Sequence, residues 1–187
     1  RGGAPPRRAP RAQHVMAAPR THPFPANVPL QPFDKLLTLE SRLRAACQTS
    51  DRLDDPALQA EARQLVPAEV LRERAACEPV GMSADESEAL FRQLLRWFKH
   101  EFFSWVNAPA CVACGGATRG VGSAPPSADD LAGGASRVEL YQCKACHAHT
   151  RFPRYNEPRR LLRTRRGRCG EWANAFTLFA RAMGYRA

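Results

Sequence analysis

The sequence predicts an α+β fold that is mostly helical, and three patterns in its 187 residues support this prediction. Several stretches repeat apolar residues every three or four positions, as amphipathic helices do. Residues 138–143 instead alternate in the manner of a short strand. Two C-x-x-C pairs complete the pattern, Cys111 with Cys114 and Cys143 with Cys146. Hydrophobic residues make up 44% of the chain, which is enough for most of it to fold around a core.

The N-terminal stretch is predicted to be a disordered tail. Residues 1–33 contain eight prolines and five arginines and no acidic residue, so they bury too little apolar surface to offset chain entropy. The net charge of +10 is concentrated in this tail and in residues 151–187, which carry ten arginines. Residues 34–150 are slightly acidic, with 13 basic and 16 acidic residues. This uneven distribution argues against nucleic acid as a partner, which favours one basic face on the folded body.

No segment resembles a membrane span or a signal peptide. No apolar run approaches the roughly 20 residues that a spanning helix needs, and the N-terminus lacks the apolar core of a signal peptide. The chain starts at Arg1 and stops at Ala187 without a terminating signal, so we expect a fragment of a longer protein. Its seven cysteines therefore indicate metal ligands and free thiols in a reducing compartment, and we expect no membrane partner.

Residues 34–80 are predicted to form a helical segment of unclear role. Apolar residues spaced for one helix face predict a helix over 33–47. Two shorter helices are predicted near 56–66 and 67–76, with Pro56 and Pro67 in their first turns. The strongest helical pattern spans 84–106, with a heavy aromatic face and a capping box of Ser83 and Glu86 at its start. Residues 115–137 are rich in Gly, Ser and Ala and are expected to be a flexible loop.

The last predicted element is a helix over residues 171–183. Trp172, Ala175, Phe176, Phe179 and Met183 recur at helical spacing in this stretch. Gly184 follows as a suitable C-cap, because glycine readily adopts the left-handed conformation that ends many helices.

The two C-x-x-C pairs predict a structural zinc site. Each pair lets a tight turn aim two thiolates at one ion, and two such turns complete a tetrahedral sulfur cage. The ligands would be Cys111, Cys114, Cys143 and Cys146, within a zinc-binding insertion at 111–146. Because a four-cysteine cage has no open position, this Zn²⁺ is expected to clamp the loop rather than take part in chemistry.

Cys169 is the candidate nucleophile. It lies at the start of the predicted C-terminal helix, where unpaired N–H groups and the helix dipole favour a thiolate. Arg165, Arg166 and Arg168 are expected to add positive potential, and Gly167 and Gly170 to leave the sulfur uncrowded. A structural thiol near a helix end is the alternative interpretation of the same residues.

Three blocks of sequence together resemble the peptide:N-glycanase family of the transglutaminase-like superfamily. The first block covers 97–107 (WFKHEFFSWVN) and leads into 111–116 (CVACGG). The second is the pair at 143–146 followed by 151–156 (RFPRYN), and the third is 167–174 (GRCGEWAN). These blocks stand in the family's order and cover roughly residues 84–187. Residue 175 is an alanine where the family often has a second cysteine.

The resemblance implies a transglutaminase-like (papain-like) core, here truncated, whose N-terminal part is residues 81–187. It also implies a peptide-N4-(N-acetyl-β-glucosaminyl)asparagine amidase, which removes N-linked glycans from misfolded glycoproteins in the cytoplasm. Cys169 would be the nucleophile of a Cys-His-Asp triad whose His and Asp lie beyond this fragment. The paired cysteines would be the zinc ligands. Proteasome-shuttle and unfoldase machinery would be the partners.

Other residues are candidates for substrate binding. The backbone N–H of Cys169, or the indole of Trp105, could stabilise an oxyanion. The arginines at 159–168 could hold the substrate, and Glu171 and Trp172 could line a sugar site. Three alternatives stay open at this point: a catalytically inactive transglutaminase-like scaffold, a zinc-ribbon nucleic-acid-binding module, and a transglutaminase or protease.

Overall fold

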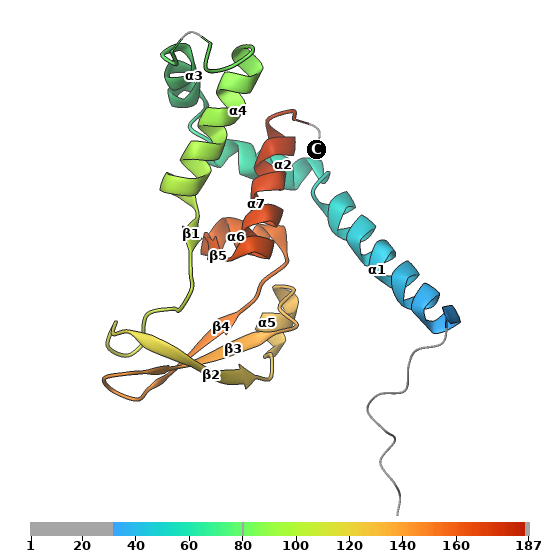
Figure 1. The fold of residues 1–187 in the computed structure, drawn as a ribbon, viewed down its shortest axis with the longest axis vertical. Coiled ribbons are helices and arrows are strands. Elements are labelled where there is room, and N and C mark those ends of the chain that lie inside the picture. The colour runs from blue at the N-terminus through green and yellow to red at the C-terminus, as the bar shows by residue number, and fades with distance from the viewer. Residues whose placement is uncertain (1–31, 80, 186–187) are drawn as a thin grey trace, which may run out of the picture. The chain divides into compact units, whose positions relative to one another are not determined.

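The computed structural model describes residues 32–79 and 81–185, and the chain divides into two compact units, 1–40 and 41–187 (Figure 1). The tail predicted for 1–33 lies outside the described residues, except that the first helix begins at Pro32. The helices are α1 (Pro32–Arg52), α2 (Pro56–Leu65), α3 (Ala68–Ala76), α4 (Glu86–Trp97), the π-helix η1 (Phe98–Phe102), α5 (Ala128–Ala132), α6 (Pro158–Thr164) and α7 (Cys169–Ala182). The strands are β1 (Ser104–Trp105), β2 (Thr118–Ala124), β3 (Val138–Cys143), β4 (His149–Pro153) and β5 (Arg166–Gly167).

Helices α2 and α3 form close to where the apolar spacing predicts them. Asp55 caps α2, since its carboxylate accepts hydrogen bonds from the backbone N–H of Ala57 (2.8 Å) and of Leu58. Pro56 follows at the first helical position, where its missing N–H has no cost. Helix α1 extends to Arg52, five residues beyond the predicted end.

The start of α4 differs from the predicted capping box by two residues. Asp85 is the N-cap, and its carboxylate accepts from the N–H of Glu88 at 2.8 Å. The carboxylate of Glu88 reaches back to the N–H of Ala84 at 2.6 Å. The Ser83 hydroxyl bonds to Glu78 instead, so the same type of cap forms with a different pair of residues.

The aromatic helix ends earlier than predicted. At Phe98 it widens into the π-helix η1, in which the N–H of Phe103 donates to the carbonyl of Phe98 at 2.8 Å. Phe103 is already extended, and Ser104 and Trp105 form strand β1 instead of another helical turn. The prediction of helix through residue 106 is therefore wrong for its last four residues, which are drawn out into strand pairing.

Phe98 lies at the centre of the hydrophobic core. It is fully buried, and its ring lies 4.9 Å from Trp172 and 5.8 Å from Phe179 on helix α7. The same core contains Leu58 and Leu71 from α2 and α3. Packing thus runs across residue 80, and the division of domains at that point stays a prediction.

Strands β2, β3 and β4 form an antiparallel sheet in that order, at the opposite end of Figure 1 from α3. Strand β3 confirms the prediction for 138–143. The flexible loop expected over 115–137 is wrong, because β2 pairs with β3 there, with Thr118 opposite Cys143. Helix α5 also forms in this region behind a capping box of Ser127 and Asp130. That cap is a sequence signal that the glycine-rich composition obscured.

Helix α6 and strand β5 lead into the C-terminal helix. Glu157 caps α6 by accepting from the N–H groups of Arg159 and Arg160, and Pro158 occupies its first position. Strand β5 pairs in parallel with β1, with Trp105 opposite Gly167. Helix α7 confirms the predicted helix but starts two residues earlier, and Gly184 ends it with φ +89° as expected.

The described elements confirm an α+β fold that is mostly helical. Within the described stretches of the chain, no helix is both long and apolar enough to cross a membrane.

Candidate functional site

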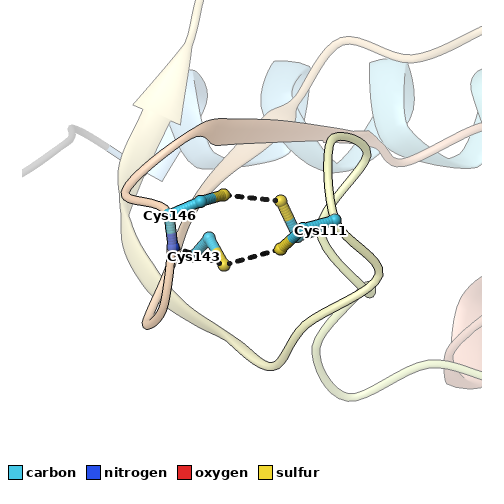
Figure 2. Close-up of side chains that lie close together, drawn as sticks. Cys111, Cys143 and Cys146 are labelled. Atoms are coloured by element: carbon cyan, nitrogen blue, oxygen red, sulfur yellow. Dashed lines mark hydrogen bonds between the residues drawn. The ribbon is translucent and has the colours of Figure 1, made fainter.

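The four paired cysteines lie together at one end of the antiparallel sheet (Figure 2). Their sulfur atoms all lie within 4.8 Å of one another. Sγ of Cys111 is 3.6 Å from Sγ of Cys146, and Sγ of Cys114 is 3.5 Å from Sγ of Cys143. The pairing of β2 with β3 and the turns at each C-x-x-C bring together residues that lie more than 25 positions apart.

Glycines make room for this cluster. Gly115 has φ +72°, a left-handed conformation that a side chain would disfavour. A Cβ on Gly116 would lie 3.2 Å from Sγ of Cys114 and 3.4 Å from Sγ of Cys143. The two glycines after the first pair therefore let the backbone turn tightly around the sulfur atoms.

Backbone N–H groups point at the sulfur atoms. Those of Cys146 and Ala145 lower the pKa of Cys143 to about 6. The N–H of Ala113 likewise lowers the pKa of Cys111. For Cys114, the N–H of Gly116 acts in the same direction, but hydrogen bonds with the neighbouring thiols raise its pKa to about 12. Four thiolates this close together need a cation between them.

The cluster fits a tetrahedral thiolate-bound metal ion. A zinc–sulfur distance of about 2.3 Å places tetrahedral ligand atoms about 3.8 Å apart, close to the separations of 3.5 and 3.6 Å. Soft sulfur ligands in this number favour zinc or iron–sulfur chemistry over hard cations. These four cysteines could hold a metal ion.

Cys169 is the first residue of α7, directly after strand β5 and the N-cap Arg168. Its thiol is exposed, unlike the sulfur atoms of Cys111 and Cys143. Among the described residues, the thiol has no hydrogen-bond partner, so no histidine of this part of the chain lies beside it as a base. The strand-to-helix turn presents the sulfur to solvent at a helix N-terminus.

The N-cap of α7 leaves backbone donors free. Arg168 has no acceptor atom in its side chain, so it cannot cap the helix as Ser or Asp would. Within the described residues, no side chain accepts from the N–H groups of Cys169 and Gly170. Two aligned N–H donors beside an exposed thiol are the arrangement that stabilises an oxyanion.

The side chain of Arg168 is bound to the sheet and to the backbone that follows β1. Its guanidinium lies 2.8 Å from a carboxylate oxygen of Glu139 on β3 and donates to the carbonyls of Val106 (2.8 Å) and Asn107 (2.9 Å). Glu139 is buried and also accepts from the hydroxyl of Tyr141 at 2.7 Å. Glu139 therefore offsets the positive charge that was expected from Arg168 at the candidate nucleophile.

Glu171 is also part of this network. It is only 3% exposed, which rules out the expected role in lining an open sugar site. Its carboxylate accepts from Nη2 of Arg154 at 2.8 Å and from the N–H of Arg168 at 3.1 Å. Burial by itself would raise the pKa of Glu171, but these hydrogen bonds and the charge of Arg154 hold that pKa below its ordinary value of 4.5. The carboxylate is therefore ionised and anchored.

The other arginines of the 159–168 cluster are largely structural as well. Arg159 pairs with Glu61 at 2.9 Å, and Arg160 pairs with Asp129. Arg165 lies over the ring of Phe102, 4.7 Å from its centre. These contacts join α6 to α2, α5 and η1, so most of the expected substrate-binding charge is used inside the chain.

Two tryptophans near Cys169 differ in exposure. Trp105 is 54% exposed and lies opposite Gly167 in the β1–β5 pair, while its indole N–H donates to Oδ1 of Asn107 at 3.0 Å. Trp172 packs on Phe98 and Phe176 and belongs to the rim of the core. Trp105 is thus placed beside the candidate site, whereas the ring of Trp172 is a packing group.

Little in the local order of residues singles out Glu139 and Arg154. Glu139 stands in the alternating strand pattern, where its inward position was a usable signal, since a buried carboxylate needs a cation. Arg154 lies just after β4, a strand that the sequence did not predict. Their meeting depends on the pairing of β3 with β4, which brings Arg154 next to Glu139.

The transglutaminase-like superfamily pattern matches residues 122–187. The chain is similar to curated proteins named peptide-N(4)-(N-acetyl-beta-glucosaminyl)asparagine amidase. The relative from Oryza sativa subsp. japonica is 47% identical over 140 residues, 72% of this chain and 31% of the relative. The relative from Arabidopsis thaliana is 45% identical over 155 residues, 78% of this chain and 21% of the relative. The relative from Homo sapiens is 46% identical over 142 residues, 72% of this chain and 22% of the relative. The chain therefore spans between about a fifth and a third of the length of these relatives.

Proposed function

We propose that this chain belongs to the transglutaminase-like superfamily and supplies the nucleophile of a peptide-N4-(N-acetyl-β-glucosaminyl)asparagine amidase. The observation that carries this proposal is the placement of Cys169. An exposed thiol at a strand-to-helix turn, with free backbone donors beside it, is suited to attack on a carbonyl carbon. The identity of 45–47% to three proteins that bear this name gives the reaction class.

In the proposed reaction, the Cys169 thiolate attacks the side-chain amide carbon of a glycosylated asparagine. The carbonyl oxygen becomes an oxyanion, which the N–H of Cys169 stabilises. The carbon–nitrogen bond then breaks, and the glycosylamine leaves with a proton from a histidine acting as general acid. Water attacks the resulting thioester and gives its proton to the same histidine. The carbon–sulfur bond then breaks, which releases the Cys169 thiolate and leaves an aspartate in the peptide. The histidine and its aspartate partner would lie outside residues 1–187 of the same protein.

Cys111, Cys114, Cys143 and Cys146 would hold a Zn²⁺ ion. With all four positions filled by thiolates, zinc here supplies folding energy and no catalytic chemistry. It would join the turn after Cys111 to the β3–β4 turn and so fix the sheet that contacts the first turn of α7.

The cellular setting follows from the family resemblance. We propose that the substrates are misfolded N-glycosylated proteins in the cytoplasm, with unfoldase and proteasome-shuttle proteins as partners. Residues 81–187 would form the N-terminal part of the catalytic core, after a tail at 1–33 and a helical segment at 34–80.

The competing proposal is a catalytically inactive scaffold of the same superfamily. An exposed, unpaired Cys169 favours the enzyme, because a scaffold has no need for a free thiol at this turn. A nucleic-acid-binding module fits less well, since Arg159, Arg160 and Arg168 are paired with acidic groups of the chain.

The test is to incubate the full-length protein that contains these residues with a denatured N-glycoprotein in ¹⁸O-water. We expect loss of the glycan and one ¹⁸O in the new aspartate, read by mass spectrometry, and no reaction for Cys169→Ala. Cys77→Ala is the matched control, because Cys77 is an exposed thiol at the end of α3 and should be dispensable. An intact glycan with folded, zinc-loaded wild-type protein would refute the enzyme and support the scaffold.

A further inference from the structure

One guanidinium group joins the helix of the candidate nucleophile to the sheet of the cysteine cluster. Nη2 of Arg154 lies 2.8 Å from Oε2 of Glu171, and Nε of Arg154 donates to the other oxygen of the same carboxylate. Nη1 of Arg154 lies 3.0 Å from Oε1 of Glu139 on β3. Arg154 thus holds two carboxylates from two elements at once, and its side chain is 18% exposed.

The Glu171 end of this bridge reaches the backbone beside Cys169. Oε2 of Glu171 accepts from the N–H of Arg168, the residue directly before Cys169. Gly167 packs against the same side chain so closely that a Cβ there would lie 2.3 Å from Cβ of Glu171. The position of the Glu171 carboxylate therefore determines where α7 begins and how the first residue of that helix is oriented.

The Glu139 end of the bridge has two further contacts. Glu139 also pairs with Arg168 at 2.8 Å and accepts from the hydroxyl of Tyr141. Strand β3, which carries Glu139 and Tyr141, ends in Cys143, one of the clustered cysteines. Strand β3 is thus a rigid reference against which the start of α7 is placed.

We propose that Arg154 is a positioning residue for Cys169, which rests on the proposed function of Cys169 as the nucleophile. Arg154 does not touch the thiol. It holds Glu171, and Glu171 holds the N-cap amide, so that the sulfur and the N–H of Cys169 point together at one carbonyl group of the substrate.

The planar, forked guanidinium group of an arginine is required for this role. Two parallel N–H···O bonds to Glu171 and a third bond to Glu139 need a planar group with donors on several edges. A lysine at this position would supply the charge but only one point of contact. Loss of the cation would leave Glu171 as a buried carboxylate without its partner, and the first turn of α7 would shift to rehydrate it.

The experiment compares Arg154→Gln and Arg154→Lys with the matched control Arg151→Gln in the full-length protein. Arg151 on β4 pairs with the buried Asp130 of helix α5 and has no hydrogen bond or ion pair with α7 among the described residues, so its loss removes a similar ion pair elsewhere. Four quantities are measured: kcat and KM for glycan release, the thermal unfolding temperature, and the rate of iodoacetamide alkylation of Cys169 relative to that of the exposed Cys77, which is followed by peptide mass spectrometry.

For Arg154→Gln we expect a kcat lower by about 10- to 100-fold, as misplaced catalytic groups cause, with little change in KM. We expect the ratio of alkylation rates to fall by about two- to fivefold, because a thiol at a loosened helix start loses dipole stabilisation. Arg154→Lys should fold as the wild type does and still lose much of kcat. Arg151→Gln should leave kcat and the ratio of alkylation rates unchanged and lower only the unfolding temperature.

Wild-type kcat and alkylation ratio in Arg154→Lys, or equal effects of Arg154→Gln and Arg151→Gln, would overturn the positioning role. If the wild type releases no glycan while the alkylation ratio still falls in the Arg154 variants, the proposed function fails and the positioning role stands. If the wild type releases glycan and the alkylation ratio is unchanged in the Arg154 variants, the proposed function stands and the positioning role fails.

Discussion

The two glycines on either side of the Arg168–Cys169 pair should respond in opposite ways to an added methyl group. In Gly167→Ala, the new Cβ would lie 2.3 Å from Cβ and 2.8 Å from Cγ of Glu171. Ordinary contact begins at 3.4 Å, so the first turn of α7 would have to move by about 1 Å. In Gly170→Ala, the Cβ meets nothing within 4 Å.

The structure gives the magnitude of each effect. Overpacking at Gly167 costs about 1–3 kcal/mol, and the cost rises to about 3–5 kcal/mol if the shift breaks the buried pair of Glu171 and Arg154. For a chain of this size, each kcal/mol corresponds to roughly 2–4 °C in the unfolding temperature. Gly170→Ala should instead stabilise by up to about 1 kcal/mol, because alanine is the better helix former.

The assay is thermal unfolding of both zinc-loaded variants, followed by circular dichroism beside the wild type. Gly167→Ala should unfold several degrees lower, and Gly170→Ala at the wild-type temperature or slightly above. Equal changes in the unfolding temperature of the two variants would contradict this expectation, because they would mean that the close approach of Gly167 to Glu171 does not constrain the start of α7.

Three further outcomes are expected. Phe98→Ala should destabilise the protein by about 3–5 kcal/mol in denaturant unfolding, since it removes a fully buried ring at the centre of the core. Cys143→Ser should abolish the binding of one zinc ion per chain, measured by metal analysis after gel filtration, whereas Cys77→Ser should not. The lowered pKa of Glu171 contributes stability above its ordinary value of 4.5 that is lost as the pH falls through the lowered value. Unfolding temperature measured from about pH 6 to about pH 3 should therefore drop more steeply in the wild type than in Glu171→Gln.

Each of these three predictions would be contradicted by one specific result. A loss below about 1 kcal/mol for Phe98→Ala would mean that the aromatic cluster repacks around the gap. Zinc retained by Cys143→Ser would remove the four-cysteine site. Identical pH profiles for the wild type and Glu171→Gln would mean that the Glu171–Arg154 pair does not distinguish the folded from the unfolded state.

Features that depend on the local order of residues were predictable from the chain alone. Helices α2, α3 and α7 follow from apolar spacing, and Gly184 ends α7 because only a left-handed residue suits that position. The two C-x-x-C pairs identify the cysteine cluster, since each turn brings two sulfur atoms together on its own. Cys169 was singled out in the same way, from its place before a helical pattern.

The remaining features depend on contacts between segments that are remote in sequence. Strand β2 has a composition typical of a loop, and it is a strand because β3 offers it a partner. The last turn of the aromatic helix gives way to strand β1 because β5, some 60 residues later, pairs with it. The arginines at 159–168 suggest a positive patch in the sequence, but Arg159, Arg160 and Arg168 each pair with an acidic side chain that is remote in sequence. Ion pairs and strand pairs of this kind depend on which distant segments meet, and a local pattern of residues carries no information about that.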